Sequence, residues 1–255
     1  ESGTYTDIDA NGGAAVWNEA ELYIKGGTFT TEYAGSSSDQ YGPGCLNSQG
    51  KAVISGGTFE GASKRTYAII STGNMVICEE DGAVAGTGVH GAVSSDGGTL
   101  DIYGGTFTST EFYGLYVSND GAGADPKKAA VNIYGGEFTG PSYSVWLGSD
   151  VNDPVDSVIN IWGGVFHKDI MLQENAETSG AIRIYGGTYG KALKESLLAS
   201  GYHQVKNGDQ TYTVQAQSPS ASVGDRTFAS LEDAFRAARD GETITMLKSV
   251  EETDG

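Results

Sequence analysis

Apolar and polar positions recur in one short pattern along most of the chain. The pattern is an isoleucine, a variable residue, two glycines, another variable residue and an aromatic residue. Six copies begin at Ile24, Ile54, Ile102, Ile133, Ile161 and Ile184. The longest gap between copies is divided nearly in half if Ile77 marks a degenerate copy, in which Glu79 and Glu80 replace the glycines. Such a repeat predicts stacked structural turns, about seven of them.

A second apolar run precedes every copy and predicts another strand in each turn, as at 68–70, 115–117 and 145–147. Side chains alternate across a strand, so the repeated isoleucine and the residue two before it should face inward. We expect the glycine pair to bend the chain and to return the aromatic residue, such as Phe107, to the core. Parallel strands stacked at a fixed period make an all-β solenoid.

These coils resemble the right-handed parallel β-helix, or pectin-lyase-like, modules of large surface proteins from gut-dwelling Gram-positive bacteria. The resemblance is carried by the Ile-x-Gly-Gly-Thr-Phe copies, for example at 102–107, and covers about residues 1–190. It implies that residues 191–217 form the strand pair that closes the helix. It also implies that residues 218–255 open a following module. The implied fold is a parallel β-helix, with no particular activity attached to it.

Residues 218–255 also predict a helix and a strand on physical grounds. Ser230 and Asp233 have the spacing of a capping box at a helix N-terminus. The apolar face that follows consists of Leu231, Ala234, Phe235 and Ala238. Gly241 should end the helix before a strand over 243–247. A helix and a strand could equally cap the solenoid, so both interpretations stay open.

The composition limits the partners of the chain. A formal net charge of −18 and a pI near 4.3 should repel both nucleic acid and an anionic membrane surface. No apolar run is long enough to cross a membrane, so we expect no transmembrane segment. The chain starts at Glu1 without a leader, which predicts a mature or excised piece of a longer protein. Two cysteines are too few for a disulfide framework.

Outward aromatic residues are the main candidates for ligand binding. Four consecutive turns carry one between the isoleucine and the glycine pair: Tyr103, Tyr134, Trp162 and Tyr185. Stacked at about 4.8 Å per turn, their rings would form a flat strip on which sugar rings could lie. A ladder that only supports the sheet, or burial under a loop or neighbouring module, would explain the pattern as well. A second outward strip is predicted beside it: Val93, Tyr116, Trp146 and Met171.

The loops between the two strand columns are rich in acidic residues. The densest cluster consists of Asp150, Asp153 and Asp156. Calcium prefers oxygen ligands, so this cluster is a candidate calcium site, and no other cofactor is indicated. It lacks the glycine and the terminal glutamate of an EF-hand loop, and a solvated acidic rim would also account for it.

Catalytic patterns are incomplete. The segments Gly88-Val89-His90-Gly91 and Arg183-Ile184-Tyr185 only approach those of polygalacturonases. We therefore predict a non-catalytic extracellular module, at the cell surface or secreted, that binds a glycan or host surface ligand and adjoins other modules of its chain. Tyr103, Tyr134, Trp162 and Tyr185 are the predicted ligand contacts, with Tyr116 and Trp146 next. A spacer without a ligand and a polysaccharide-degrading enzyme remain alternatives.

Overall fold

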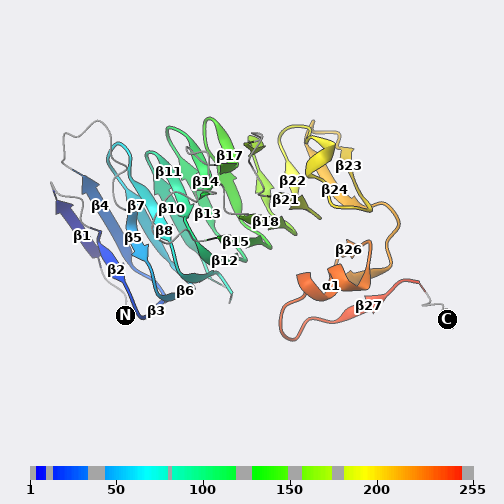
Figure 1. The fold of residues 1–255 in the computed structure, drawn as a ribbon, viewed down its shortest axis with the longest axis horizontal. Helices are drawn as coiled ribbons and strands as arrows, with labels where there is room; N and C mark the ends of the chain where they lie inside the picture. Colours follow the sequence, from blue (N-terminus) through cyan, green and yellow to red (C-terminus); the bar gives the residue numbers. More distant parts are fainter. Residues whose placement is uncertain are drawn as a thin grey trace.

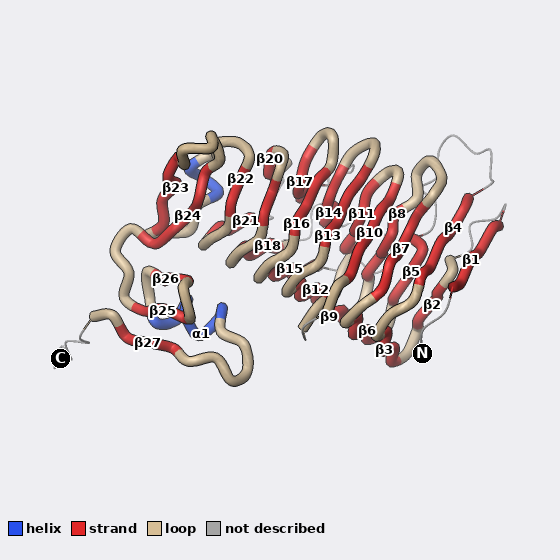
Figure 2. Tube along the Cα trace, turned by 180° about the vertical axis from the view of Figure 1, so that it is seen from behind, coloured by secondary structure: helices blue, strands red, loops and turns tan. Residues whose placement is uncertain are grey.

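The chain winds through three sheets in turn, which we call sheets B, C and A in the order in which each coil visits them. The computed structural model describes residues 4–9, 14–33, 44–79, 82–118, 128–148, 157–173 and 181–248. Strands of successive coils lie side by side and parallel (Figure 1), and the same stacking is seen from behind (Figure 2). The predicted all-β parallel β-helix is confirmed.

Sheet C contains the repeated isoleucines. Ile77 pairs with Ile54 on one side and Ile102 on the other, so the degenerate copy does belong to the column. The isoleucine side chains are buried throughout, as alternation predicts. In spatial order the strands are β3 (Glu21–Ile24), β6 (Lys51–Ile54), β9 (Asn74–Ile77), β12 (Gly98–Ile102), β15 (Ala129–Ile133), β18 (Val158–Ile161) and β21 (Ala181–Ile184).

Sheet B contains the apolar runs that precede the motif. Val93 pairs with Leu115 and is fully buried, whereas Ser94 pairs with Tyr116. The prediction that Val93 faces outward is therefore wrong. The pairing skips Ala92, and the side chains of Ala92 and Val93 both face the core. The strands are β2 (Val16–Asn18), β5 (Gly44–Ser48), β8 (Tyr67–Ser71), β11 (Gly91–Ser95), β14 (Tyr113–Ser118), β17 (Tyr143–Gly148) and β20 (Asp169–Leu172).

Sheet A gives each coil a third strand, beginning at or just after the glycine pair, that the two apolar columns did not reveal. Its inward aromatic rings stack from coil to coil, with centroids 5.1 Å apart for Phe107 and Phe138 and 5.3 Å for Phe138 and Phe166. Gly86 interrupts the stack between Phe59 and Phe107. The parallel strands are β1 (Thr4–Asp9), β4 (Thr28–Tyr33), β7 (Gly57–Gly61), β10 (Val84–Gly88), β13 (Thr106–Ser109), β16 (Glu137–Thr139), β19 (Val165–Phe166) and β22 (Thr188–Tyr189).

The glycine pair makes the bend between sheets C and A. Gly136, the second of its pair, has φ of 99°, a backbone conformation that a side chain would strain. Gly135 lies against the coil below, where a Cβ atom would come within 2.5 Å of the Tyr103 carbonyl oxygen. The second glycine of the pair thus permits the bend, and the first permits close stacking of the coils.

An antiparallel hairpin ends the stacking in sheet A. Strand β24 (Tyr212–Ala216) pairs antiparallel with β22 and with β23 (Tyr202–Lys206). A short 3₁₀ helix, Glu195–Leu197, precedes the hairpin. The parallel register is broken here, so the next coil has no strand in sheet A to extend.

Residues 218–248, which we call the C-terminal segment, fold into a small three-stranded sheet with one helix. The strands are β25 (Ala221–Val223), β26 (Arg226–Phe228) and β27 (Ile244–Met246), and helix α1 spans Leu231–Ala237. The amide of Asp233 donates to Ser230 Oγ at 3.0 Å, which confirms the predicted cap. Phe235 is 65% exposed, so its predicted place on the buried face is wrong; the short helix buries the smaller Ala234 and Ala237 instead.

Candidate functional site

The four aromatic residues predicted as the main ligand strip form a stacked ladder directly after strands β12, β15, β18 and β21. We call Tyr103, Tyr134, Trp162 and Tyr185 the aromatic ladder. The ring centroids of Tyr103 and Tyr134 lie 4.5 Å apart at an interplanar angle of 7°, and those of Trp162 and Tyr185 lie 3.9 Å apart at 14°. Backbone pairing sets this spacing, since each ladder amide donates to the isoleucine carbonyl of the preceding coil.

The C-terminal end of the chain covers one half of the aromatic ladder. Trp162 and Tyr185 are only 4% and 8% exposed. The ring of Phe228 in β26 lies 6.4 Å from that of Trp162, and the ring of Tyr202 in β23 meets that of Tyr185 edge-on at 5.3 Å. A ligand could stack on Trp162 or Tyr185 only if these groups moved away.

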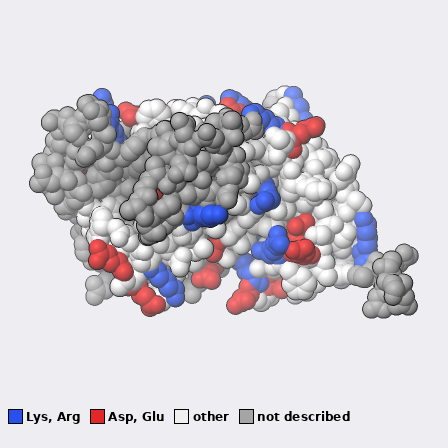
Figure 3. Space-filling model, in the orientation of Figure 1, with Lys and Arg blue, Asp and Glu red and all other residues white. Residues whose placement is uncertain are grey.

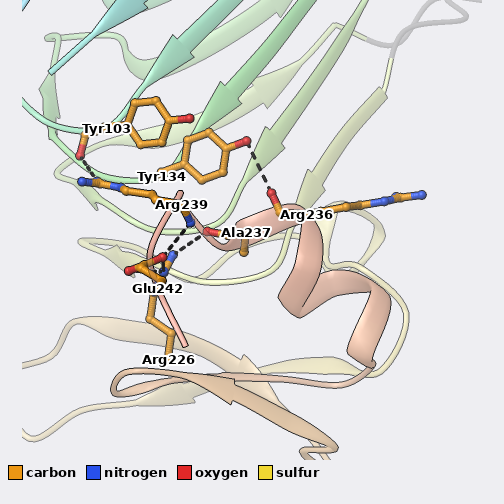
Figure 4. A network of polar contacts seen from close by, with 7 residues as sticks. All are labelled: Tyr103, Tyr134, Arg226, Arg236, Ala237, Arg239 and Glu242. Atoms are coloured by element: carbon orange, nitrogen blue, oxygen red, sulfur yellow. Dashed lines mark hydrogen bonds and ion pairs between the residues drawn. The ribbon is translucent and has the colours of Figure 1, made fainter. Parts of the chain in front are cut away.

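Two arginines of the C-terminal segment approach the other half of the ladder (Figure 4). The Arg239 guanidinium lies 4.5 Å from the centroid of the Tyr103 ring, and its Nη2 donates to the Tyr103 carbonyl oxygen at 3.2 Å. The Tyr134 hydroxyl donates to the backbone carbonyl of Arg236 at 3.5 Å. Of the three explanations left open by the sequence, burial under another part of the chain therefore describes Trp162 and Tyr185, whereas Tyr103 and Tyr134 are contacted by that part and stay partly exposed.

Burial changes the acidity of the ladder tyrosines. It raises the pKa of Tyr134 to about 12, and the nearby carboxylate of Asp101 adds to the increase. The pKa values of Tyr103 and Tyr185 are also raised, again mainly by burial. The phenols thus stay neutral over the physiological range, which suits a packed interface.

A cleft of about 410 Å³ remains between the aromatic ladder and the C-terminal segment. Its walls include Tyr134, Trp162 and Phe228, and the guanidinium of Arg226 lines it. Arg226 already pairs with Glu242 at 2.9 Å, and it donates to a carbonyl of helix α1 at 3.2 Å (Figure 4). The basic group of this cleft is thus engaged in holding the segment together.

A second group of aromatic rings lies on the outer face of sheet B, where β14 and β17 run side by side. We call Tyr113, Tyr116, Tyr143 and Trp146 the sheet B platform. The Trp146 ring centroid lies 4.8 Å from that of Tyr113 and 5.0 Å from that of Tyr116. Tyr113 and Tyr143 stack at 6.2 Å with an interplanar angle of 8°. All four side chains are partly exposed, and the predicted residues Tyr116 and Trp146 are brought together here.

Further rings extend the sheet B platform toward the preceding coil. The His90 ring lies 4.7 Å from that of Phe112 and 5.8 Å from that of Tyr113. Gly91 makes room for this arrangement, because a Cβ atom there would come within 2.4 Å of the Tyr67 ring. The aromatic surface therefore spans more than the two strands that form its centre.

The sequence carried a signal for the missed rings of this platform. Residues 113–117 and 143–147 share the order tyrosine, small residue, aliphatic residue, aromatic residue, aliphatic residue. The first tyrosine of each, Tyr113 or Tyr143, precedes the inward pair and points outward together with Tyr116 or Trp146. Strict alternation would have placed this first tyrosine on the inner face. It points outward because the corner before the strand adds one residue to the alternating pattern.

The other candidate chemistry finds little support in the described residues. Asp150, Asp153 and Asp156 lie outside them, so the calcium prediction stays a prediction. Among the described residues, no group of three or more histidine, cysteine, aspartate or glutamate side chains could hold a metal ion. Cys45 and Cys78 are both unpaired and buried, and burial raises the pKa of Cys45 to about 12. A thiol of that kind is not a ready nucleophile.

Comparisons with known proteins give no family for this chain. No family model, no curated protein and no solved structure matches it. In the part of the chain that the structure describes, no helix is long and apolar enough to pass through a bilayer. The fold and the surface chemistry therefore carry the functional argument.

Proposed function

We propose that this chain is a non-catalytic, extracellular glycan-binding module of a multi-module bacterial surface protein of the pectin-lyase-like type. The sheet B platform is the proposed binding surface. The observation that supports it most is the gathering of four partly exposed rings on two adjacent coils, within 6.2 Å of one another along the printed contacts.

Aromatic platforms suit sugars for a physical reason. The axial C–H groups of a sugar ring form an apolar face that can lie on a tyrosine or tryptophan ring, and its hydroxyls need polar partners at the edge. Asp96 provides such a partner, because its partly exposed carboxylate accepts a hydrogen bond at 2.9 Å from buried Ser94, the neighbour of Tyr116 in the sheet. Tyrosine and tryptophan also lose little conformational entropy on binding.

The aromatic ladder has a different place in this proposal. Its predicted ligand contacts Tyr103, Tyr134, Trp162 and Tyr185 face residues of the same chain, so the ladder serves first as a surface for packing protein elements. This observation favours the second candidate function, a spacer that joins neighbouring modules without binding a ligand. The two functions are compatible, since they use different faces of the solenoid.

The proposal is tested with a glycan array followed by titration of a hit into the protein. Trp146→Ala should abolish binding of the hit, and Trp146→Phe should retain part of it because the ring remains. Tyr116→Ala should weaken binding by about twofold to thirteenfold, as expected for loss of one aromatic contact worth about 0.5–1.5 kcal/mol.

Trp17→Ala is the matched control for this test. Trp17 is another outward tryptophan of sheet B, it is 56% exposed, and it lies in the first strand of the sheet, away from β14 and β17. Its loss should leave binding unchanged. A blank array, or equal losses in Trp17→Ala and Trp146→Ala, would refute the platform and favour the spacer.

A further inference from the structure

A groove on the outer face of sheet C differs in character from the rest of that face. The central outward column of the sheet runs through Tyr23, Val53 and Val76 on strands β3, β6 and β9. The same column then continues with polar side chains: Asp101, Asn132, Asn160 and Arg183. The change occurs between one strand and the next, without any change in backbone pairing.

The polar part of this column shows that the fold does not require apolar residues there. Asn132 Nδ2 donates to Asp101 Oδ1 at 2.8 Å, and Asn160 Nδ2 donates to Asn132 Oδ1 at 3.0 Å. These side chains satisfy one another along the stack while the sheet continues. Tyr23, by contrast, is 59% exposed. The first three strands thus expose apolar side chains to solvent at positions where polar side chains would be compatible with the fold. Such an exposed apolar strip indicates a binding surface.

The apolar strip is the floor of a concave site, which we call the Tyr23 groove. The groove has a volume of about 510 Å³, within the usual range of ligand sites. Its floor is formed by Tyr23, Val53 and Val76, and its rim carries Lys25, Lys51 and Glu79. Three strands spaced about 4.8 Å apart make a floor roughly 10 Å long, enough for one or two sugar rings.

The rim of the Tyr23 groove favours an anionic group. Lys25 and Lys51, on neighbouring coils, both line the groove, and Glu79 is the one carboxylate of the described lining. Lys51 approaches Glu21 only to 3.9 Å, with both side chains more than half exposed, so that pair holds its ammonium weakly. Within the described residues, Lys25 has no ion-pair partner. On the face drawn in Figure 3, the basic and acidic side chains of the described residues are interspersed.

We infer that the Tyr23 groove binds a carboxylate-bearing saccharide. The apolar face of the sugar lies on Tyr23, with Val53 and Val76 beneath its acyl or ring carbons. The carboxylate lies between the ammonium groups of Lys25 and Lys51, and Glu79 accepts hydrogen bonds from hydroxyls. This site lies on a different sheet from the proposed platform and does not depend on it. A neutral sugar would offer no carboxylate to Lys25 and would leave Lys51 with only its 3.9 Å contact to Glu21, which makes the groove selective for acids.

Calorimetric titration with three probes tests the inference: 3′-sialyllactose, a glucuronate-terminated trisaccharide and lactose. At least one acidic probe should bind, and lactose should bind at least tenfold more weakly. The two acidic probes distinguish a terminal sugar with an acyl group from a simple uronic acid. Raising the salt concentration should weaken binding, because exposed charges are screened.

Variants of the full chain locate the binding. Lys25→Gln and Lys51→Gln should each reduce affinity roughly tenfold, Tyr23→Ala should abolish it, and Tyr23→Phe should retain it. Lys206→Gln, at an exposed lysine of β23, is the control and should have no effect.

Four outcomes would overturn the inference. They are equal binding of lactose, no binding of either acid, unchanged affinity in both lysine variants, and tighter binding of a polyglutamate peptide than of either sugar. Trp146→Ala should leave affinity unchanged, and its failure to do so would place the ligand on the sheet B platform instead.

Discussion

Replacing Arg239 by alanine should loosen the C-terminal segment while leaving the solenoid intact. The guanidinium makes two contacts with the aromatic ladder, a cation–π contact at 4.5 Å and a hydrogen bond to the Tyr103 carbonyl at 3.2 Å. The first is worth about 0.5–2 kcal/mol and the second about 1.5–3 kcal/mol, and the two are not additive. Because the side chain is only partly buried, we expect a loss of about 2 kcal/mol, roughly 30-fold in the opening equilibrium of the segment.

Native-state amide hydrogen exchange measures this opening directly. Exchange should accelerate roughly 30-fold in β25, β27 and α1, and should stay unchanged in β12, β15 and β18. Arg236→Ala is the matched control, since the Arg236 side chain pairs with Glu232 within the helix and only its backbone carbonyl meets Tyr134. This control should change the exchange rate by no more than about threefold, because exposed ion pairs between residues four apart in a helix contribute only about 0.3–0.5 kcal/mol. Equal effects of the two variants, or faster exchange throughout the solenoid, would refute a local role of Arg239.

Three further predictions concern stability. Phe138→Ala should lower the free energy of unfolding by about 3–5 kcal/mol in denaturant titrations, because the fully buried ring stacks on both sides, while the exposed Phe235→Ala should change it by less than about 0.5 kcal/mol. Gly136→Ala should destabilise by at least about 1 kcal/mol by the same measurement because of its positive φ, whereas Gly26→Ala, with open space around it, should be nearly neutral. Stability should fall as pH rises from about 10 to about 12, because the unfolded chain loses the Tyr134 proton first and the folded chain retains it; Tyr134→Phe should flatten that part of the pH profile.

The repeated part of the fold could be predicted because each structural requirement recurs at a fixed place. Ile24, Ile54 and their equivalents must face the core in every coil, and the second glycine of the pair that follows must adopt positive φ. Six imperfect copies of the motif are therefore enough to show which positions the fold constrains. Ile77 could be placed even without its glycines for the same reason. There Cys78 itself adopts a positive φ of 56°.

The parts that could not be predicted depend on contacts that occur once. Arg239 contacts Tyr103 across a sequence separation of 136 residues, and the repeat pattern of the sequence does not predict such a contact. The corner before sheet B places Ala92 and Val93 both inward, so alternation alone shifts the outward column by one residue and hides Tyr113 and Tyr143. Only the path of the chain through three sheets resolves these positions.

The two aromatic surfaces show why ring identity alone does not define a binding site. Tyrosine and tryptophan rings lie close together on both sheets, at similar distances, because the spacing of the coils brings them side by side. What separates them is the partner. Trp162 meets Phe228 and Tyr103 meets Arg239, so the ladder packs against another part of its own chain, whereas Trp146 lies against Tyr113 and Tyr116 on the outer face of sheet B. A solenoid that binds both a neighbour and a ligand needs two such surfaces, and loss of sugar binding in Trp146→Ala without a change in segment exchange would separate their roles.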